Sequence, residues 1–412
     1  MEGFNYRNKK LYCEGTDIKK IAEKIGTPFY VYSGNVIEKN YMTLEKMLTG
    51  VDHIICYACK VNSNLSIFKM LKGLGCGADI ISGGELFKAQ KSGIPSKKIV
   101  FAGVGKTEKE IMYALEENIL LLNVESFQEL SLINKVAGKL KKKAPVSIRV
   151  NWGLDPHTHR YINTSKGTKF GFELKEALRA YQEAKKLKNI EIKGIHSHIG
   201  SNIKEHSAFL KTLEMSLQLA AQLKKKKIFL KYINLGGGLG ISYKGKEKFF
   251  DTKEYGKGIR QLLGNKEYTL IVEPGRFIAG NAGALITKVL YTKRSFGKNF
   301  VIVDAGMNDM IRPALYGAYH NILPVFRSLG RSIVKTDVVG PICETGDFFA
   351  LGRKMFCFEQ NDLLGVMDTG AYGYEMSSNY NSRPRVAQVL VNKNKFKIIK
   401  KRETYEDLVK GE

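Results

Sequence analysis

Eight short apolar segments, separated by helix-like or looped stretches, constrain the fold of this chain more than any other feature. They cover residues 54–58, 77–81, 99–102, 120–124, 146–150, 192–199, 232–235 and 270–272. Strand alternating with helix eight times is typical of a (β/α)8 barrel, whose usual length of about 250 residues suits this span. Three capping-box pairs support the register, each beginning a helix after a strand: Ser82 and Glu85, Thr107 and Glu110, Ser126 and Glu129.

The chain on either side of this barrel is patterned as strands and turns. Residues 1–34 contain one short helix, from its cap Asp17 to its stop Gly26, and a strand at 29–32. Later strands are expected at 284–291, 299–303, 333–339 and 363–367, before a hairpin over 386–399 that turns near 392–394. The sequence therefore predicts an α/β plus β chain, with a barrel at 35–280 inserted into a mainly β domain of 1–34 and 281–412.

Composition narrows the class of protein. The 412 residues, 43% of them hydrophobic, suit two globular domains. The start of the chain lacks the apolar core of a signal peptide, and no apolar run approaches the roughly 18 residues of a membrane span. We therefore expect a cytoplasmic protein without membrane contact, whose six scattered cysteines stay free and reduced.

The formal net charge of +26 raises nucleic-acid binding as a hypothesis. The lysine runs at 141–143 and 224–227, however, lie at the ends of predicted helices, where cations complement the helix dipole. No known nucleic-acid motif accompanies them. We interpret them as solvated faces that can attract an anionic substrate, and we expect no nucleic-acid partner.

Lys60 lies at the end of the first predicted strand, where barrel enzymes place catalytic groups. A lysine at a strand end most often points into solvent. Burial, in contrast, favours the neutral amine, a nucleophile that can bond covalently to a carbonyl compound. The residues at the other strand ends favour this second interpretation.

Several other strand ends carry polar side chains or glycines: Asp79 at the second, His196 and His198 at the sixth, Gly236, Gly237 and Gly238 at the seventh, and Glu273, Pro274, Gly275 and Arg276 at the eighth. A glycine run lets backbone N–H groups approach a phosphate, and a nearby arginine can grip the same anion. With Lys60 these groups indicate pyridoxal phosphate. The lysine takes its aldehyde, the glycines take its phosphate, Glu273 holds its pyridine nitrogen protonated, and His198 stacks on its ring.

Two other chemistries remain open. His196 and His198 on one strand point the same way and could bind zinc, although further ligands are not evident at other strand ends. An aldolase that uses the lysine without a cofactor leaves Glu273 and the glycines unexplained. A glycine run alone is more often a tight turn.

The chain resembles the fold-type III pyridoxal phosphate-dependent decarboxylases over nearly its whole length, and within them the diaminopimelate decarboxylases. Residues 57–60, 198–201, 236–238 and 273–276 are similar to the wider group, which includes ornithine and arginine decarboxylases. Residues 304–309, 312–316, 318–320, 343–347 and 370–385 resemble the diaminopimelate decarboxylases more specifically. Thr345 departs from the serine usual in that family.

This resemblance implies a role for each site residue. Lys60 and Cys343 would be catalytic, the first attaching the cofactor and the second donating a proton. The cofactor site would comprise Lys60, Asp79, His198, Ser201, Gly237, Gly238, Glu273, Pro274, Gly275, Arg276 and Tyr372. The distal end of the substrate would be held by Arg276, Arg312, Tyr316, Glu344 and Tyr372, with no metal.

The resemblance also implies the reaction, which is decarboxylation of meso-2,6-diaminopimelate to L-lysine and carbon dioxide at the carbon of D configuration. This is the last step of lysine biosynthesis. The alternative is a related decarboxylase of ornithine, arginine or carboxynorspermidine. In the family, the segment with Cys343 and Glu344 reaches into the neighbouring subunit, which implies a homodimer with shared sites, and residues 152–168 resemble a mobile lid.

Overall fold

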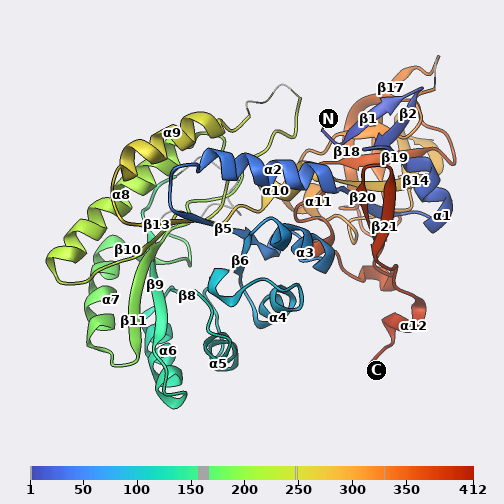
Figure 1. Cartoon of the computed structure of the whole chain (residues 1–412). Helices are drawn as coiled ribbons and strands as arrows, with labels where there is room; N and C mark the ends of the chain where they lie inside the picture. Colours follow the sequence, from blue (N-terminus) through green and yellow to red (C-terminus); the bar gives the residue numbers. More distant parts are fainter. Residues whose placement is uncertain (1, 156–166, 246, 248, 329) are drawn as a thin grey trace. The chain divides into compact units, whose positions relative to one another are not determined.

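The structure, a computed structural model, describes residues 2–155, 167–245, 247, 249–328 and 330–412 (Figure 1). Most of the expected lid, residues 156–166, lies outside the described residues. The chain divides into two units. The barrel unit comprises residues 40–241 and 248–277, and the β unit comprises residues 1–39, 242–247 and 278–412.

Eight parallel strands close the barrel unit. They are β5 (His53–Ala58), β6 (Gly77–Ile80), β7 (Ile99–Phe101), β8 (Leu121–Val124), β9 (Ala144–Asn151), β11 (Ile190–His196), β12 (Tyr232–Asn234) and β13 (Thr269–Val272). Each strand pairs with the next, and β13 pairs with β5, where Leu270 lies opposite His53. The predicted barrel is confirmed. Its interior is packed, as in other barrels, by side chains from several strands: Cys56, Val100, Leu121, Tyr232 and Ile271.

Helices connect these strands and lie outside them (Figure 1). They are α3 (Leu65–Gly73), α4 (Gly83–Lys91), α5 (Glu108–Glu116), α6 (Phe127–Lys139), α7 (Leu174–Lys186), α8 (His206–Lys225) and α9 (Thr252–Leu263). Thr107 and Glu110 form the expected reciprocal capping box. At Ser82 and Ser126 only the serine half forms, because each helix's glutamate accepts the N–H of the residue before the serine.

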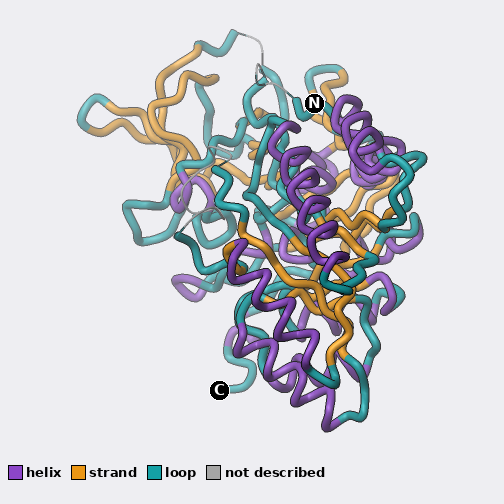
Figure 2. Tube along the Cα trace, turned by 90° about the vertical axis from the view of Figure 1, so that its left-hand side faces the viewer, coloured by secondary structure: helices purple, strands orange, loops and turns teal. Residues whose placement is uncertain are grey.

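The β unit is built on a nine-stranded sheet, whose strands Figure 2 shows in orange. Its main path runs β18-β17-β15-β14-β4-β20-β21, with β19 paired to β14 and β16 to β19. The bounds are β4 (Phe29–Ser33), β14 (Gly283–Ser295), β15 (Lys298–Val303), β16 (Ile322–Pro324), β17 (Ile333–Val339), β18 (Phe348–Phe356), β19 (Leu363–Met367), β20 (Ala387–Asn392) and β21 (Lys395–Lys400). The N-terminal strand β4 lies between β14 and β20, which confirms the predicted mainly β domain formed from both ends of the chain.

The remaining elements are short, apart from one long helix. A small sheet joins β1 (Phe4–Arg7), β2 (Lys10–Cys13) and β3 (Thr16–Asp17), and β10 (Phe172–Glu173) pairs with β9. The helices are α1 (Ile18–Ile25), α2 (Gly34–Met47), α10 (Arg276–Ala279), α11 (Arg312–Tyr316) and α12 (Tyr405–Leu408). Asp17 caps α1 by accepting the N–H of Lys19, and Gly26 ends it, as expected. Within the described residues, every helix is too short or too polar to cross a bilayer.

Candidate active site

Lys60 lies at the carboxyl end of the first barrel strand. β5 ends at Ala58, and Lys60 is in the 3₁₀ turn η1 (Cys59–Val61) that follows. Its Nζ lies 3.1 Å from Oδ2 of Asp79, which belongs to the neighbouring strand β6. The Asp79 side chain is fully buried, whereas the Lys60 side chain is 31% exposed. The amine is therefore oriented by a buried carboxylate while it remains accessible.

Glu273 follows the last barrel strand and is buried. Its Oε1 accepts a hydrogen bond from Nδ2 of Asn234 at 2.6 Å, and its Oε2 lies 3.2 Å from Nε2 of His196. Burial by itself would raise the pKa of Glu273, but His196 and Lys60 lower it to about 2. Burial and the charge of Glu273 raise the pKa of Asp79 to about 8, against the effect of Lys60. Near neutral pH, Glu273 is therefore ionised, whereas Asp79 holds a proton more readily than an ordinary carboxyl group.

A tight glycine turn, residues 236–238, follows β12. Its first and third glycines have φ of +67° and +110°, which favour glycine, and a Cβ on Gly237 would lie 2.1 Å from the backbone oxygen of Glu273. The backbone is thus packed too closely for side chains. In the same unit, Nη2 of the buried Arg276 donates to Oγ of Ser201 at 3.1 Å.

Pro274 and Gly275 connect β13 to Arg276. The backbone N–H of Ala58 donates to the oxygen of Pro274 at 3.2 Å, which ties the ends of the first and last strands together. A Cβ on Gly275 would lie 2.3 Å from Cγ2 of Val61, next to Lys60. A side chain at position 275 would therefore collide with the turn that carries Lys60, which explains the glycine.

The groups present in the barrel unit fit pyridoxal phosphate. An amine suits an aldehyde, an ionised carboxylate suits a protonated ring nitrogen, and an arginine with a hydroxyl suits a phosphate. In addition, Oδ1 of Asp79 is buried and has no hydrogen-bond partner among the described residues, so a polar group is required beside it.

The prediction that His196 and His198 share one strand is wrong. β11 ends at His196, and the chain then leaves the sheet. The zinc hypothesis loses the geometry on which it rested, and among the described residues no group of three or more His, Cys, Asp or Glu side chains could hold a metal ion. Nδ1 of His198 instead accepts the N–H of Gly237 at 3.2 Å. Burial and the cations of Lys60 and Arg149 lower the pKa of His198 well below its usual value, which makes it a neutral imidazole.

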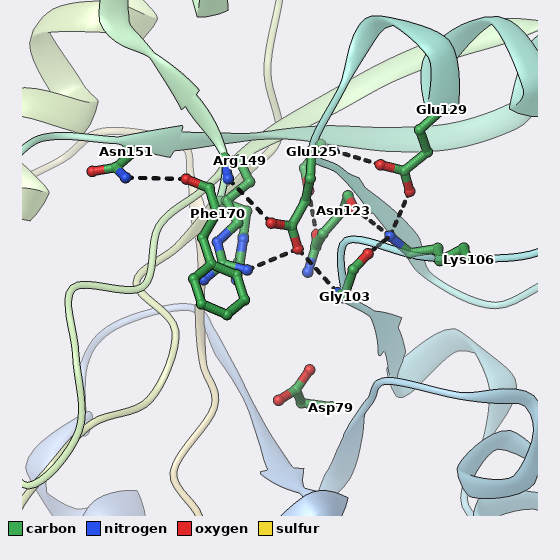
Figure 3. A network of polar contacts seen from close by, with 12 residues as sticks. Asp79, Gly103, Lys106, Asn123, Glu125, Glu129, Arg149, Asn151 and Phe170 are labelled. Carbon is green, nitrogen blue, oxygen red and sulfur yellow. Dashed lines mark hydrogen bonds and ion pairs between the residues drawn. The ribbon is translucent and has the colours of Figure 1, made fainter. Parts of the chain in front are cut away.

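A buried cluster of ionised side chains lies at the ends of β7, β8 and β9 (Figure 3). Oε1 of Glu125 accepts from Nη1 of Arg149 at 2.8 Å and from the N–H of Gly103 at 3.0 Å. Its Oε2 accepts the N–H of Gly171 at 3.1 Å, and the guanidinium of Arg149 packs 4.6 Å from the ring centroid of Phe170. One carboxylate therefore fixes both the arginine and the chain that returns at residues 170–171.

Lys106 is the second cation of this cluster. Its Nζ donates to Oε1 of Glu129 at 2.6 Å and to the carbonyls of Gly103 and Asn123 at 2.8 and 2.7 Å. Both charged side chains are buried, and Glu129 also accepts the N–H of Glu125 at 2.7 Å. Two buried ion pairs, Lys106–Glu129 and Arg149–Glu125, therefore stabilise this part of the barrel mouth.

Replacing Lys106 by methionine should destabilise the barrel unit by about 3–5 kcal/mol, because it leaves the buried Glu129 carboxylate without its cation. Urea unfolding measures this through the fluorescence of Trp152, the single tryptophan of the sequence, which lies in the barrel unit. The matched control is Lys139→Met, because Lys139 lies equally close, 2.6 Å, to Glu108 in an exposed pair. Its unfolding midpoint should scarcely change. Equal shifts in the two variants would contradict the prediction.

In the β unit, Arg312 begins α11 and is 7% exposed. Its Nη1 donates to Nε2 of His320 at 2.9 Å and to the hydroxyl of Tyr243 at 3.2 Å. Within the described residues it forms no ion pair with a carboxylate. A buried cation without a counter-charge is suited to bind an anionic group.

The other site residues expected in the β unit are more accessible. Cys343 and Glu344 are exposed in the turn between β17 and β18, where the N–H of Cys343 donates to Oδ1 of Asn381 at 2.9 Å. Tyr316 and Tyr372 are half-buried. Tyr372 has a φ of +57°, a left-handed conformation that costs a non-glycine residue roughly 1–2 kcal/mol. Such strain is common where a side chain has a functional position.

Sequence reasoning missed the residues that position these groups. Asn234 had a detectable signal, because it is a polar residue at the end of an apolar strand, two positions before a glycine run. For the others no sequence pattern indicates a positioning role, since that role depends on side-chain contacts in the folded chain: Lys106, Glu125, Glu129, Arg149, Tyr243 and His320.

Comparison with known proteins identifies the family. Residues 35–280 match the model of the pyridoxal-dependent decarboxylases, pyridoxal binding domain. A diaminopimelate decarboxylase of Aquifex aeolicus (strain VF5) is 49% identical over 98% of this chain and 96% of its own length. A diaminopimelate decarboxylase of Pseudomonas fluorescens is 44% identical over 100% of this chain and 99% of its own length. The crystal structure of the Helicobacter pylori diaminopimelate decarboxylase with L-lysine matches with a TM-score of 0.92 and 42% identity, over 96% of this chain and 98% of that one. The chain therefore belongs to the pyridoxal-dependent decarboxylases, in the family of the diaminopimelate decarboxylases.

Proposed function

We infer that this chain is a pyridoxal phosphate-dependent carboxy-lyase that converts meso-2,6-diaminopimelate to L-lysine and carbon dioxide, the last step of lysine biosynthesis. The observation that carries this inference is identity of 41–49% to diaminopimelate decarboxylases over nearly the full length of the chain. Solved relatives from H. pylori and M. jannaschii contain L-lysine, the expected product. The barrel unit adds a matching set of groups for the cofactor.

Bound pyridoxal phosphate supplies an electron sink for the electron pair that remains when the substrate's carboxylate leaves as carbon dioxide. We propose that Lys60 would hold this cofactor covalently through Nζ. Glu273, held ionised by His196, keeps the pyridine nitrogen protonated. His198, as a neutral imidazole, would contact the ring without adding a charge.

The remaining cofactor contacts are proposed from the same residue types. The turn at Gly237 and Gly238, with Ser201 and Arg276, holds the phosphate. Asp79 orients Lys60, and Pro274 and Gly275 set the path of the chain that carries Arg276. Tyr372 completes the phosphate region from its strained turn.

We propose that the β unit binds the distal end of the substrate. Arg312, together with Arg276, Tyr316 and Tyr372, takes the distal carboxylate, and Glu344 takes the distal ammonium. The thiol of Cys343 donates its proton to the carbon that has lost the carboxylate. In this division, residues 35–280 bind the cofactor, while residues 1–34 and 281–412 provide substrate and dimer contacts.

We propose a cytoplasmic homodimer in which each site combines Lys60 of one subunit with Cys343 of the other. The exposure of Cys343 and Glu344 in the single chain supports this arrangement. Mixing inactive Lys60→Ala and Cys343→Ala subunits should then restore up to about a quarter of the activity, because hybrid dimers contain one intact site. No recovery after subunit exchange would show that each chain supplies both groups itself.

The substrate assignment is tested by measuring carbon dioxide and L-lysine release from meso-diaminopimelate, with and without added pyridoxal phosphate. We expect turnover that depends on the cofactor. Ornithine and arginine are the matched alternative substrates, since each carries a distal cation but lacks a distal carboxylate. Turnover of either one without turnover of diaminopimelate would overturn the assignment and leave the family unchanged.

A further inference from the structure

Arg312 is held by neutral groups. The two hydrogens of Nη1 are used by His320 and Tyr243, at 2.9 and 3.2 Å. The described residues provide no acceptor for its Nε and Nη2, the edge that grips a carboxylate in two-pronged fashion. The positive charge of Arg312 lowers the pKa of Asp368, but burial has the larger effect and raises that pKa to about 7. Arg312 and Asp368 form no ion pair within the described chain.

The tautomer of His320 follows from its second contact. Its Nδ1 lies 2.8 Å from the backbone oxygen of Met367, which can only accept a hydrogen bond. Nδ1 therefore carries the proton, and Nε2 presents a lone pair to Nη1 of Arg312. The ring is completely buried, and Arg353 donates to its backbone oxygen at 2.5 Å, so the acceptor cannot turn away easily.

Tyr243 restrains the same guanidinium from a different segment. Its hydroxyl accepts from Nη1, its ring centroid lies 5.2 Å from Cζ of Arg312, and its ring meets that of His320 edge to face at 5.2 Å. An aspartate or glutamate in either place would orient the arginine equally well, but it would also neutralise the charge and compete with an incoming anion. An imidazole and a phenol orient it and leave the charge in place.

We propose that His320 and Tyr243 are positioning residues, which aim the guanidinium of Arg312 at the distal carboxylate of the substrate without neutralising it. This inference rests on the proposed function, in which Arg312 binds that carboxylate. Preorganisation of this kind strengthens binding because the arginine's rotamers are ordered before the substrate arrives. The pair therefore contributes to selectivity for substrates that carry a distal carboxylate.

The test compares two inhibitors of the holoenzyme, L-lysine, which retains the distal carboxylate, and cadaverine (1,5-diaminopentane), which lacks it. In His320→Leu we expect lysine inhibition to weaken and KM for diaminopimelate to rise, each by roughly 10- to 100-fold, as for the loss of a hydrogen bond to a charged group. Inhibition by cadaverine should stay constant, and kcat should change by less than about 3-fold, because only uniform binding is lost. His320→Gln, which offers an amide oxygen to Arg312, should recover most of the lysine affinity.

Further variants separate the possible outcomes. Tyr243→Phe keeps the ring and removes only the hydroxyl, so it should weaken lysine inhibition by about 3- to 10-fold even if His320→Leu does not fold. His206→Leu, at the start of α8 in the barrel unit, is the control and should leave both inhibitors unaffected. Equal weakening of lysine and cadaverine, or no weakening of either, in both His320→Leu and Tyr243→Phe would overturn the inference.

Arg312→Met distinguishes this inference from the proposed function. If it abolishes the preference for lysine over cadaverine while His320→Leu and Tyr243→Phe preserve it, only the positioning role falls. If Arg312→Met itself preserves that preference, the assignment of the distal carboxylate to Arg312 is wrong. An unaltered enzyme that does not turn over diaminopimelate would refute the proposed function itself.

Discussion

Lys60→Ala should lose turnover of diaminopimelate by about 10⁴-fold or more, the scale seen when an enzyme loses its nucleophile. Nζ of Lys60 is oriented by Asp79 at the barrel mouth and is the amine that we propose attaches the cofactor. Borohydride reduction followed by intact-mass measurement tests the attachment without relying on activity. The unaltered enzyme should gain the mass of the reduced cofactor, and the variant should not.

The matched control for this experiment is Lys69→Ala, an exposed lysine on α3, the helix that follows Lys60. It should gain the cofactor mass and keep its activity. If Lys60→Ala still gains that mass after reduction, another amine holds the cofactor, and the site must be reassigned.

Glu273→Gln should lower kcat by roughly 10²–10³-fold, with a smaller effect on KM, because it removes the fixed carboxylate charge that would keep the cofactor's pyridine nitrogen protonated. Glutamine can still accept a hydrogen bond from Asn234, so the local structure is retained. The carboxylate's charge is absent, and the pyridine nitrogen then has no partner that keeps it protonated. Steady-state kinetics of the holoenzyme measures both constants.

A second measurement follows from the coupling between the two buried carboxylates. The charge of Glu273 helps to raise the pKa of Asp79 to about 8, so Glu273→Gln should lower that pKa. A carbon-13 NMR titration of the Asp79 carboxyl would record the shift. Glu267→Gln, exposed just before β13, is the control and should change neither kcat nor the Asp79 titration. An unchanged kcat in Glu273→Gln would exclude the proposed role of this charge.

The barrel strands were predictable from sequence because each is a short apolar run bounded by a polar or glycine-rich segment. Several strands of the β unit were not. β18 carries an irregular burial pattern, with Gly352 at φ +57°, so neither alternation nor a continuous apolar run marks it. The strand ending at His196 was extended too far, because Ile199 is apolar and buried although it lies outside the sheet.

The candidate site divides in the same way. Lys60, Glu273 and the glycine turn could be proposed because the barrel places all strand ends at one mouth. The positioning of Arg312 by His320 and Tyr243 could not, because Tyr243 is remote in sequence and no periodicity indicates that the His320 side chain turns back to the guanidinium. Local sequence patterns predict which side chains lie at the site. The protonation state and the orientation of each side chain depend on how the folded chain packs around it.

The position of β4 has a consequence for the order of assembly. Val31 of this strand lies opposite Ala284 on one side and Val389 on the other, so both partners are synthesised long after it. The barrel strands lie between β4 and β14 in the sequence, so the barrel can close while β4 still lacks both neighbouring strands. Completion of the sheet must therefore wait until β20 has left the ribosome, and pairings over such large sequence separations form slowly.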